Sequence, residues 1–437
     1  MFKKLTQVTI VTATVLSSLS AYAADKLVII SPHRKSIQEE FIPKFKEHYK
    51  SAYGTEVQVD WLDQGGTSDD IRFVRSKFKA NPKTSNIDIF WGGGATTFIE
   101  LASDNLLASY KIPGELAKQL PKTSAGVTLI DQGNYWYGTA ISSFGIFFNK
   151  KILKFDGLEE PKTWSDLASF SYYDNLIGTD PRHSGSVTLM YFIIMQSLGW
   201  EKGYEMITEL AGNMRKFSHS SSDPIKSVVA GDAAASLAID FYANSKISDL
   251  GEDNLGFNLP EGQTVLDPDP VAILKGAPNR VTAERFVQWV LSAEAQKLLL
   301  LPKGAEGGPR FTSLGRMSVN SAAYTETEKT RKGGVNPFKL KGSLKLDLKK
   351  AAKLKSVFID LVGAYHVDTH KQLRKAWKNA NKWKNAKLIG KLVTPPVSEK
   401  EILKLADKWD DSVFRNKTIN GWINDARKTY SDVAAGK

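Results

Sequence analysis

Cysteine is absent from the 437 residues of this chain. That absence excludes disulfide bonds, thiolate metal sites and a cysteine nucleophile, and it removes the thiol to which bacterial lipoproteins attach their lipid anchor. The chain also lacks any run that approaches the ~20 apolar residues that a membrane-spanning helix needs. We therefore expect a mature protein that neither spans a membrane nor carries a lipid.

The first residues have the pattern of a secretory leader. Lys3 and Lys4 precede a short apolar run at 8–19, and a small-x-small site follows at 21–23. This order of basic, apolar and small residues is typical of a cleaved signal peptide. We expect a signal peptide over 1–24, with the mature chain diffusing freely in the periplasm.

The charge balance is basic, with a formal net charge of +12. Binding to nucleic acid or to a membrane surface is one interpretation of such a balance. However, the lysine runs at 349–350 and 384–391 are spaced among Leu, Ala and Trp as on solvated helix faces. No basic-aromatic single-strand motif and no zinc-finger spacing accompanies them, so we expect no nucleic-acid partner.

The length exceeds the ~250 to 300 residues at which a single core stops growing, so at least two lobes are expected. The first part of the mature chain repeats one unit, a short apolar strand, a loop of small residues and an amphipathic helix. The expected strands are 26–30, 56–61 and 87–91. Alternating strands and helices with short loops predict an α/β lobe on a mostly parallel sheet.

The loops after these strands are candidate ligand contacts, because open α/β sheets bind ligands outside the carboxyl ends of their strands. Glycines let a ligand approach the backbone, and helix starts favour anions. For the glycine triplet at 92–94, a tight turn with no function is an equally good interpretation. The candidates in these loops are His33, Gly66, Thr67, Gly93 and Gly94.

The nearly continuous run of small and apolar residues at 136–149 predicts a buried strand that passes into a second lobe. There the pattern returns, with an apolar helix at 187–198 and a strand at 236–240 that ends in Phe241 and Tyr242. The chain is expected to return near 265–271. We predict these divisions after the leader: first lobe 25–144, second lobe 145–264, and a return to the first lobe plus a helical C-terminal region over 265–437.

The C-terminal region is predicted to be helical and lysine-rich. Its tryptophans, at 377, 383, 409 and 422, have spacings suited to core packing. His366 and His370 have the i, i+4 spacing of a metal pair. On a lysine-rich helix we interpret them as surface residues.

Several segments together resemble the extracellular solute-binding family of ABC importers, in the branch that holds ferric-ion, sugar-phosphate, phosphonate, thiamine and polyamine binders. The resemblance covers about 26–301. It implies a type II-like periplasmic-binding-protein architecture, with mixed, mostly parallel sheets flanked by helices and two strands crossing between the lobes. The segments are 163–167, 180–186, 231–234 leading to Phe241 and Tyr242, 266–275 and 291–296.

Ferric-ion binders of that branch hold the metal with a histidine after the first strand, a glutamate after the third and a pair of tyrosines. His33 matches the histidine and Tyr242 one tyrosine, but the glutamate position falls in 92–94 and Phe241 replaces the other tyrosine. Ferric ion is a hard cation best served by several anionic oxygens. No metal is therefore favoured, and a ferric-ion transport protein is the alternative, with His33 and Tyr242 as its ligands.

The residues that hold the anion in the family site are better matched in this sequence than those that hold the metal. Ser184, Gly185 and Ser186 match its phosphate-holding helix start, Ser222 lies in the next loop, and Arg182 or His183 could add charge. We predict a small ligand with a phosphate-like, phosphonate-like or carboxylate group. Three carboxylates could bind a hydroxyl, an amine or a cation at its other end, although the Asp-Pro-Asp-Pro stretch could also be only a rigid turn. They are Asp240, Asp267 and Asp269.

The resemblance implies a binding protein that is not an enzyme, carries no cofactor, acts as a monomer and delivers its ligand to a membrane permease. The main rival class is an exported hydrolase of phosphate or glycoside substrates. The sequence has no Gly-x-Ser-x-Gly elbow, no His-Glu-x-x-His motif and no thiol to support it. A structural envelope protein without a small-molecule ligand is a third class.

Overall fold

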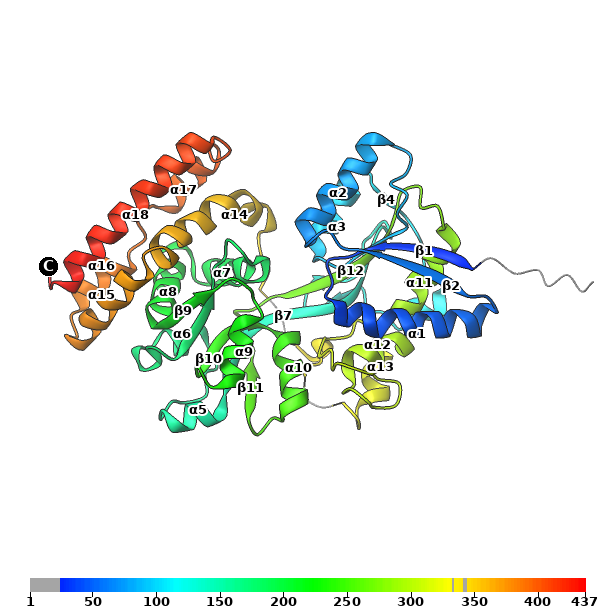
Figure 1. Cartoon of the computed structure of the whole chain (residues 1–437), viewed down its shortest axis with the longest axis horizontal. Helices are drawn as coiled ribbons and strands as arrows, with labels where there is room; N and C mark the ends of the chain where they lie inside the picture. The colour runs from blue at the N-terminus through cyan, green and yellow to red at the C-terminus, as the bar shows by residue number, and fades with distance from the viewer. Residues whose placement is uncertain (1–23, 332–333, 341–343) are drawn as a thin grey trace, which may run out of the picture.

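The computed structural model describes residues 24–437, except 332–333 and 341–343. The predicted signal peptide, apart from its last residue, lies outside the described residues. The chain forms two α/β halves side by side, with a set of helices at the C-terminal end stacked on the second half (Figure 1). Within the described ranges, no helix has both the length and the apolar character to cross a bilayer.

The first half, which we call the first lobe, is built on parallel strands. Ile29 of one strand lies opposite Trp61 and Ile89 of its two neighbours. Because these strands run the same way, the loops at their carboxyl ends meet at one edge of the sheet. The elements are β1 (Asp25–Ile30), α1 (Lys35–Tyr53), β2 (Val57–Leu62), α2 (Thr67–Ala80), β3 (Ile89–Trp91) and α3 (Ala95–Ser103).

Later segments complete the first lobe. Phe286 and Trp289 of α11 pack against Phe45 of α1, with ring centroids 5.0 and 5.3 Å away. These aromatic contacts close the core on one face of the sheet. The remaining elements are β4 (Leu107–Ala108), α4 (Gly114–Ala117), β5 (Thr123–Ser124), β6 (Val127–Thr128), α11 (Arg280–Leu291), α12 (Ala293–Leu300), α13 (Ser321–Thr327) and the 3-10 turn η2 (Pro337–Lys339).

One long strand, β7 (Tyr137–Asn149), connects the halves, and every one of its residues is buried. Its first part pairs with β12 (Leu266–Leu274) and its second part with β10 (Ala235–Ile239) and β11 (Leu255–Asn258). The partner changes at Ser143 and Phe144. β7 and β12 run together between the halves (Figure 1), as the predicted two-lobed class requires.

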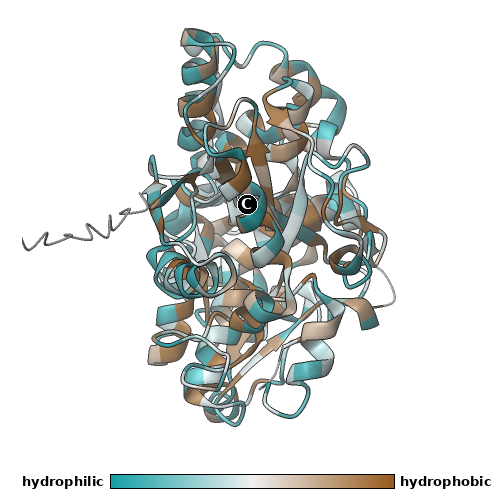
Figure 2. Cartoon of the chain, turned by 90° about the vertical axis from the view of Figure 1, so that its right-hand side faces the viewer, coloured by the Kyte–Doolittle hydropathy of each residue, from teal (hydrophilic) through white to brown (hydrophobic). Residues whose placement is uncertain are grey.

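The second half, or second lobe, continues the sheet in the order β7, β10, β8, β9. Figure 2 shows apolar residues concentrated in the strands of the sheets and polar residues along the outer loops. The strand predicted at 236–240 is one residue too long, since β10 ends at Ile239 and Asp240 begins a helix that carries Phe241 and Tyr242 in its first turn. The elements are α5 (Lys150–Phe155), α6 (Trp164–Ala168), the 3-10 turn η1 (Phe170–Tyr172), β8 (Leu176–Thr179), α7 (Gly185–Leu198), α8 (Trp200–Asn213), β9 (Met214–Ser218), α9 (Asp223–Ala230) and α10 (Asp240–Leu250).

The C-terminal helices join the core of the second lobe. Phe358 lies with its ring centroid 4.9 Å from that of Phe192 in α7. Trp377 donates from Nε1 to Asn213 Oδ1 of α8 at 2.8 Å. The elements are α14 (Leu348–Val362), a π-helical turn η3 (Gly363–Val367), α15 (His370–Lys382), α16 (Ala386–Val393), α17 (Glu399–Ala406) and α18 (Ser412–Ala434).

Two interpretations of this region were wrong. Trp383 is 47% exposed and takes no part in the core. His366 is fully buried, with Nε2 2.9 Å from Thr208 Oγ1, and burial lowers its pKa to about 3. It is thus a neutral core histidine, whose ring centroid lies 5.2 Å from that of Tyr204 in α8. His370 is half-buried rather than exposed, with Nε2 3.0 Å from Ala211 O.

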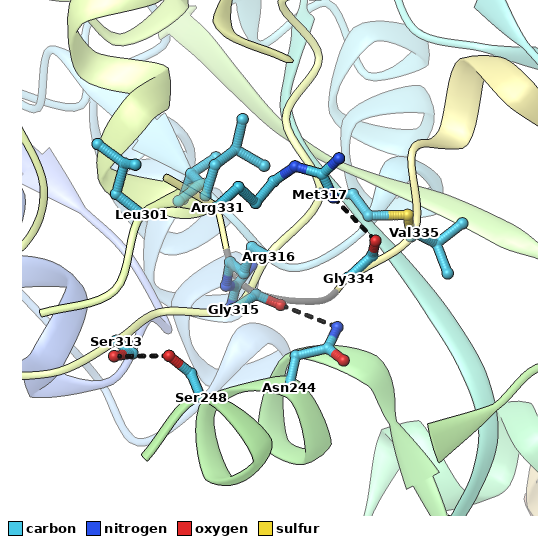
Figure 3. Close-up of a pocket in the computed structure, with 12 residues that line it drawn as sticks. Asn244, Ser248, Leu301, Ser313, Gly315, Arg316, Met317, Arg331, Gly334 and Val335 are labelled. Atoms are coloured by element: carbon cyan, nitrogen blue, oxygen red, sulfur yellow. Dashed lines mark hydrogen bonds between the residues drawn. The ribbon is translucent and has the colours of Figure 1, made fainter. Parts of the chain in front are cut away.

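A second junction between the lobes lies on α10. Asn244 donates from Nδ2 to Gly315 O at 3.3 Å, and Ser248 donates from Oγ to Ser313 Oγ at 3.3 Å. Figure 3 shows both bonds beside a pocket of about 20 Å³. In Figure 1, α10 and α13 lie below the crossing strands, whereas α2 and α14 lie above them.

Candidate functional site

A cleft of about 730 Å³ lies between the lobes, and both contribute to its walls. The first lobe supplies the loops after β1 and β3, the start and exposed face of α2, one face of α3 and the start of β12. The second lobe supplies the start of α7, the first turn of α10 and one face of α14. Nine of the predicted site residues line it: His33, Thr67, Gly93, Gly94, Gly185, Ser186, Tyr242, Asp267 and Asp269.

The carboxylate of Asp269 lies at the floor of the cleft and contacts three other residues. It lies 2.6 Å from His33 Nε2 and accepts hydrogen bonds from Arg316 Nη1 at 2.6 Å and from the Gly93 N–H at 2.8 Å. Burial alone would raise the pKa of Asp269, but the charges and hydrogen bonds of His33 and Arg316 hold it well below its usual range. The carboxylate is therefore ionised and already neutralised by the protein.

Both ring nitrogens of His33 take part in this network. Its Nδ1 lies 3.0 Å from Ser31 Oγ, and its Nε2 faces Asp269. With a partner at both ring nitrogens, the imidazole has no lone pair directed into the cleft. In this geometry its role is to position Asp269.

The glycine triplet at 92–94 has a steric cause. All three residues have positive φ, from 81° to 101°. A Cβ on Gly93 would lie 2.6 Å from the side chain of Thr67, and a Cβ on Gly94 would lie 2.9 Å from Asp267. Since both neighbours line the cleft, the triplet lets the β3 loop pass close beneath them. A glutamate has no room at these positions.

Asp267 differs from Asp269 in having no basic partner among the described residues. Its carboxylate accepts only a long hydrogen bond, 3.4 Å, from the Ala95 N–H. Burial raises the pKa of Asp267 to about 7, and the negative charge of Asp269 adds to the shift. Near neutral pH this carboxyl is therefore partly protonated and can donate as well as accept.

Two arginines lie over aromatic rings of α10. The guanidinium of Arg34, which belongs to the first lobe, lies 3.5 Å from the ring centroid of Tyr242. Arg316 lies 4.1 Å from that of Phe241. Such cation–π contacts hold the guanidinium planes in place, and the first joins the two lobes across the cleft.

The start of α7 presents an open end to the cleft. Ser184 is buried and caps the helix by accepting the Val187 N–H at 3.3 Å. Gly185 and Ser186 follow it on the cleft surface, and a Cβ built on Gly185 meets no atom within 4 Å. The free N–H groups of this first turn thus face open space.

Four predicted residues do not line the cleft. Gly66 precedes α2, Ser184 is used as a cap, and the hydroxyl of Ser222 lies 3.0 Å from that of Ser220. Asp240 is buried below the surface, where its carboxylate accepts the Phe241 N–H at 2.7 Å. The geometry gives these four no direct contact with a ligand in this cleft.

Arg182 is also directed away from the cleft. It donates to Asp180 of its own loop and to both carboxylate oxygens of Asp368, at 2.8 and 3.0 Å, beyond η3. The ion pairs of Arg182 therefore join the C-terminal helices to the loop before α7.

Sequence reasoning missed most basic residues of the cleft. Arg34 directly follows His33 and could have been found by extending the loop by one residue. Arg72 and Arg75 have the i, i+3 spacing of one helix face. Arg316 and Lys355 carry no local signal, because the fold brings them to the cleft from distant segments. All five line the cleft.

Among the described residues, no cluster of three or more His, Asp or Glu side chains could hold a metal ion. Tyr242 lies beneath Arg34, and a cation there repels a second one. The donor set on the cleft surface suits an anion better than a metal.

Two α/β lobes joined by crossing strands, with a polar cleft between them, define a two-lobed ligand-binding protein. The chain belongs to the bacterial extracellular solute-binding protein family, whose model matches residues 31–297. That family consists of binding proteins rather than enzymes.

Two solved structures share the fold. Periplasmic binding protein AfuA from Actinobacillus pleuropneumoniae, solved with fructose-6-phosphate, has a TM-score of 0.57 at 20% identity, covering 83% of this chain and 99% of that one. Apo ferric ion-binding protein A of Pasteurella haemolytica has a TM-score of 0.56 at 18% identity, covering 80% and 98%. These likenesses confirm the predicted α/β periplasmic-binding-protein architecture.

A curated relative is more similar in sequence but over a shorter stretch. The phosphoglycerate transport regulatory protein PgtC of Salmonella typhimurium is 30% identical over 160 residues, which cover 37% of this chain and 39% of that protein. The match thus spans about two fifths of the relative's length.

Proposed function

We propose that this protein captures a small organic anion in the interlobe cleft and delivers it to the membrane permease of an ABC importer. The observation that carries the proposal is Arg34, a cleft guanidinium without a carboxylate partner among the described residues. Arginine stays charged at any physiological pH. A cation held over a ring and facing an open cleft favours an anionic ligand group.

The acids of the cleft do not cancel this preference. Asp269 is neutralised by Arg316 and His33, and Asp267 is partly protonated near pH 7. Glu100 lies 3.3 Å from Arg75. The remaining charge on the cleft surface is positive.

The start of α7 supplies the second half of the proposed anion site. Its free N–H groups carry the positive end of the helix dipole, and the Ser186 hydroxyl adds a donor. Arg34 stands on the first lobe and Ser186 on the second. An anion that contacts both would favour the closed arrangement of the lobes, which is how ligand binding shifts a hinge equilibrium.

A phosphate ester is the ligand class that we favour. AfuA was solved with a sugar phosphate, and PgtC is named for phosphoglycerate transport. A volume of about 730 Å³ exceeds the needs of a bare phosphate ion and fits an organic body attached to it. The ferric alternative is less well supported, since His33 is hydrogen-bonded at both nitrogens and the glutamate position has no room for a side chain.

Titration calorimetry and thermal shift test the proposal. The panel contains 3-phosphoglycerate, glycerol 3-phosphate, fructose 6-phosphate, inorganic phosphate, spermidine and ferric citrate. A bound ligand at 100 times its Kd adds about 2.7 kcal/mol to the free energy of unfolding, so the melting temperature should rise. If no phosphorylated compound in the panel binds with saturation, the proposed ligand class is wrong; a red stoichiometric ferric complex would establish the alternative.

We also propose that the protein is a periplasmic monomer without lipid or cofactor and that it catalyses no reaction. Intact mass of the periplasmic fraction should show a chain that starts at Ala24 or Asp25, and sedimentation should give the monomer mass. Incubation with chromogenic phosphate and glycoside substrates should release no product. Turnover by the purified protein would instead favour the hydrolase.

A further inference from the structure

Helix α14 lies outside the family match, yet it is fixed along α7 at three points. At its start, the Asp347 N–H donates to Gln196 Oε1 at 2.7 Å. Nearer its end, the Phe358 ring lies against that of Phe192 with centroids 4.9 Å apart, and beyond η3, Asp368 binds Arg182. The helix therefore runs antiparallel to α7, from the end of α7 back to the loop before it.

One face of α14 forms part of the cleft surface. Ala351, Ala352 and Lys355, at i, i+1 and i+4, line the same cavity as the start of α7. The opposite face is used within the protein, since Lys350 pairs with Glu399 and Lys353 pairs with Asp407 at 2.8 Å. Lys355 pairs with no carboxylate among the described residues.

The facing wall, on α2, has no comparable free charge. Arg72 pairs with Asp69 one turn earlier, and Arg75 lies 2.7 Å from Asp104. Lys355 and Arg34 are therefore the cleft cations that the described part of the protein leaves without an acidic partner. Two such unpaired cations in the cleft favour a ligand that carries two anionic groups.

The wall between the start of α7 and α14 is apolar. Leu189 and Phe192 continue the cleft wall from Ser186 toward α14. Phe192 lies six residues beyond Ser186, a rise of about 9 Å along a helix. The apolar stretch between them suits the carbon body of a ligand, with polar groups at both ends.

We infer that α14 is the far wall of the ligand site and that Lys355 binds a second anionic group of the ligand. This rests on the proposed function, and it narrows the ligand class to compounds with two anionic groups, such as a phosphate ester that also carries a carboxylate. The C-terminal region is then part of the binding site, and its contribution is specificity.

Two probes and one substitution test the inference. Wild-type protein and Lys355→Ala are titrated with 3-phosphoglycerate, which carries a phosphate and a carboxylate, and with glycerol 3-phosphate, which carries the phosphate alone. We expect Lys355→Ala to weaken 3-phosphoglycerate binding about tenfold and to leave glycerol 3-phosphate within about twofold, because one charge-assisted contact is lost for the first ligand only. Lys355→Glu should weaken the first ligand further.

Lys353→Ala is the matched control. It removes a lysine of the same helix whose ion pair with Asp407 points away from the cleft, so both affinities should stay as in the wild type. Unchanged affinity for 3-phosphoglycerate in Lys355→Ala and Lys355→Glu overturns the inference, as does an equal loss for both probes. If the wild type binds no phosphorylated compound of the panel, the proposed function fails first; if it binds glycerol 3-phosphate or fructose 6-phosphate but not 3-phosphoglycerate, the inference alone is overturned, so the two failures are distinguishable.

Ala352→Trp tests the wall without a change of charge. Ala352 is exposed on the cleft side of α14, so an indole there should fill the far end without disturbing the core. We expect at least tenfold weaker 3-phosphoglycerate binding with an unchanged melting temperature in the absence of ligand. Wild-type affinity in this variant would place the ligand away from α14 and contradict the inference.

Discussion

The two walls of the cleft are built in different ways. On the first lobe, one carboxylate, Asp269, ties three segments together through His33, Arg316 and the Gly93 N–H. On the second lobe, the start of α7 faces open space, and Gly185 has no neighbour within 4 Å of a Cβ position. The Asp269 network of the first wall is satisfied before any ligand arrives, whereas the start of α7 still has free donors.

Because of this difference, the two walls should contribute differently to the stability of the fold and to the affinity for a ligand. A buried hydrogen-bonded charge network contributes to the fold, and losing one member leaves the others unpaired. Free backbone donors at a helix start contribute little to the fold but gain most from an incoming anion. We therefore expect substitutions in the Asp269 network to affect both stability and ligand affinity, and substitutions at the start of α7 to affect affinity alone.

The largest effect should come from Asp269→Asn. The substitution leaves Arg316, whose side chain is only 10% exposed, without its acidic partner. Breaking a buried ion pair costs about 3 kcal/mol or more. Urea denaturation should show that loss, and ligand binding should weaken as well. Because the pKa of Asp269 is depressed, its stabilisation is present above the pKa of an unfolded carboxyl and is lost as the pH falls through the folded value.

Asp60→Asn is the control for that loss. Asp60 pairs with Lys26 at 3.0 Å on the solvent side of the first lobe. An exposed pair of this kind contributes about 0.5 kcal/mol. Equal denaturation midpoints for the Asp269 and Asp60 variants would contradict the view that Asp269 organises the first wall.

Gly185→Asp should abolish binding without affecting the fold. Its side chain would enter open space, and an acid in the first turn of a helix is favourable to the helix. The same negative charge would occupy the place proposed for the ligand anion. Calorimetry should detect no binding of the phosphate ester, with a cooperative melt near the wild-type temperature. Retained binding would remove α7 from the site.

Ser186→Ala should have a smaller effect in the same direction. It removes one hydroxyl donor from a charged partner, worth ~1.5 kcal/mol, so the Kd should rise about tenfold. Ser222→Ala is the matched comparison, since its hydroxyl is directed to Ser220 outside the cleft lining. Equal losses of affinity in the two serine variants would contradict the placement of the anion at the start of α7.

The smallest expected effect concerns Asp267. Its pKa of about 7 means that the folded protein favours the protonated form, so its contribution to stability is present at low pH and is lost as the pH rises through 7. Asp267→Asn removes a negative charge near the proposed anion. We expect it to bind about threefold more tightly than the wild type at pH 8 and equally at pH 6. If the ratio of the affinities of Asp267→Asn and the wild type stays constant from pH 6 to 8, Asp267 does not titrate in this range.

The architecture could be predicted because it follows from local patterns. Apolar runs of strand length alternate with amphipathic helices, and β7 was recognisable as a continuous apolar segment. The end of β10 was placed one residue late, and the helix that follows it directly was not predicted. Propensity alone does not decide between strand end and helix start for Asp240, Phe241 and Tyr242.

The site was predictable mainly where its residues follow a strand or begin a helix. Seven candidates from such positions line the cleft, and Asp267 and Asp269 at the start of β12 complete the nine. Of the four that do not, Gly66, Ser184 and Asp240 directly precede lining residues, whereas Ser222 lies in a loop that does not reach the cleft. The side chains of Ser184 and Asp240 are hydrogen-bonded to the backbone that follows them. Side-chain direction depends on packing, which the sequence pattern does not report.

The C-terminal region was the least predictable part. Its helices were expected, but the side of the molecule that they cover depends on long-range pairs such as Phe192 with Phe358 and Arg182 with Asp368. The same pairs bring Lys355 to the cleft and bury His366. Neither placement has a signal within a window of the sequence.

Helix α10 of the second lobe contacts the first lobe at two places. Its first turn carries Tyr242 under Arg34 in the cleft, and its later turns carry Asn244 and Ser248, which hydrogen-bond to 313–315 at the second junction (Figure 3). Because α10 contacts the first lobe at both places, we expect the hydrogen bonds of Asn244 and Ser248 to influence how easily the lobes move relative to each other, although neither residue lines the cleft.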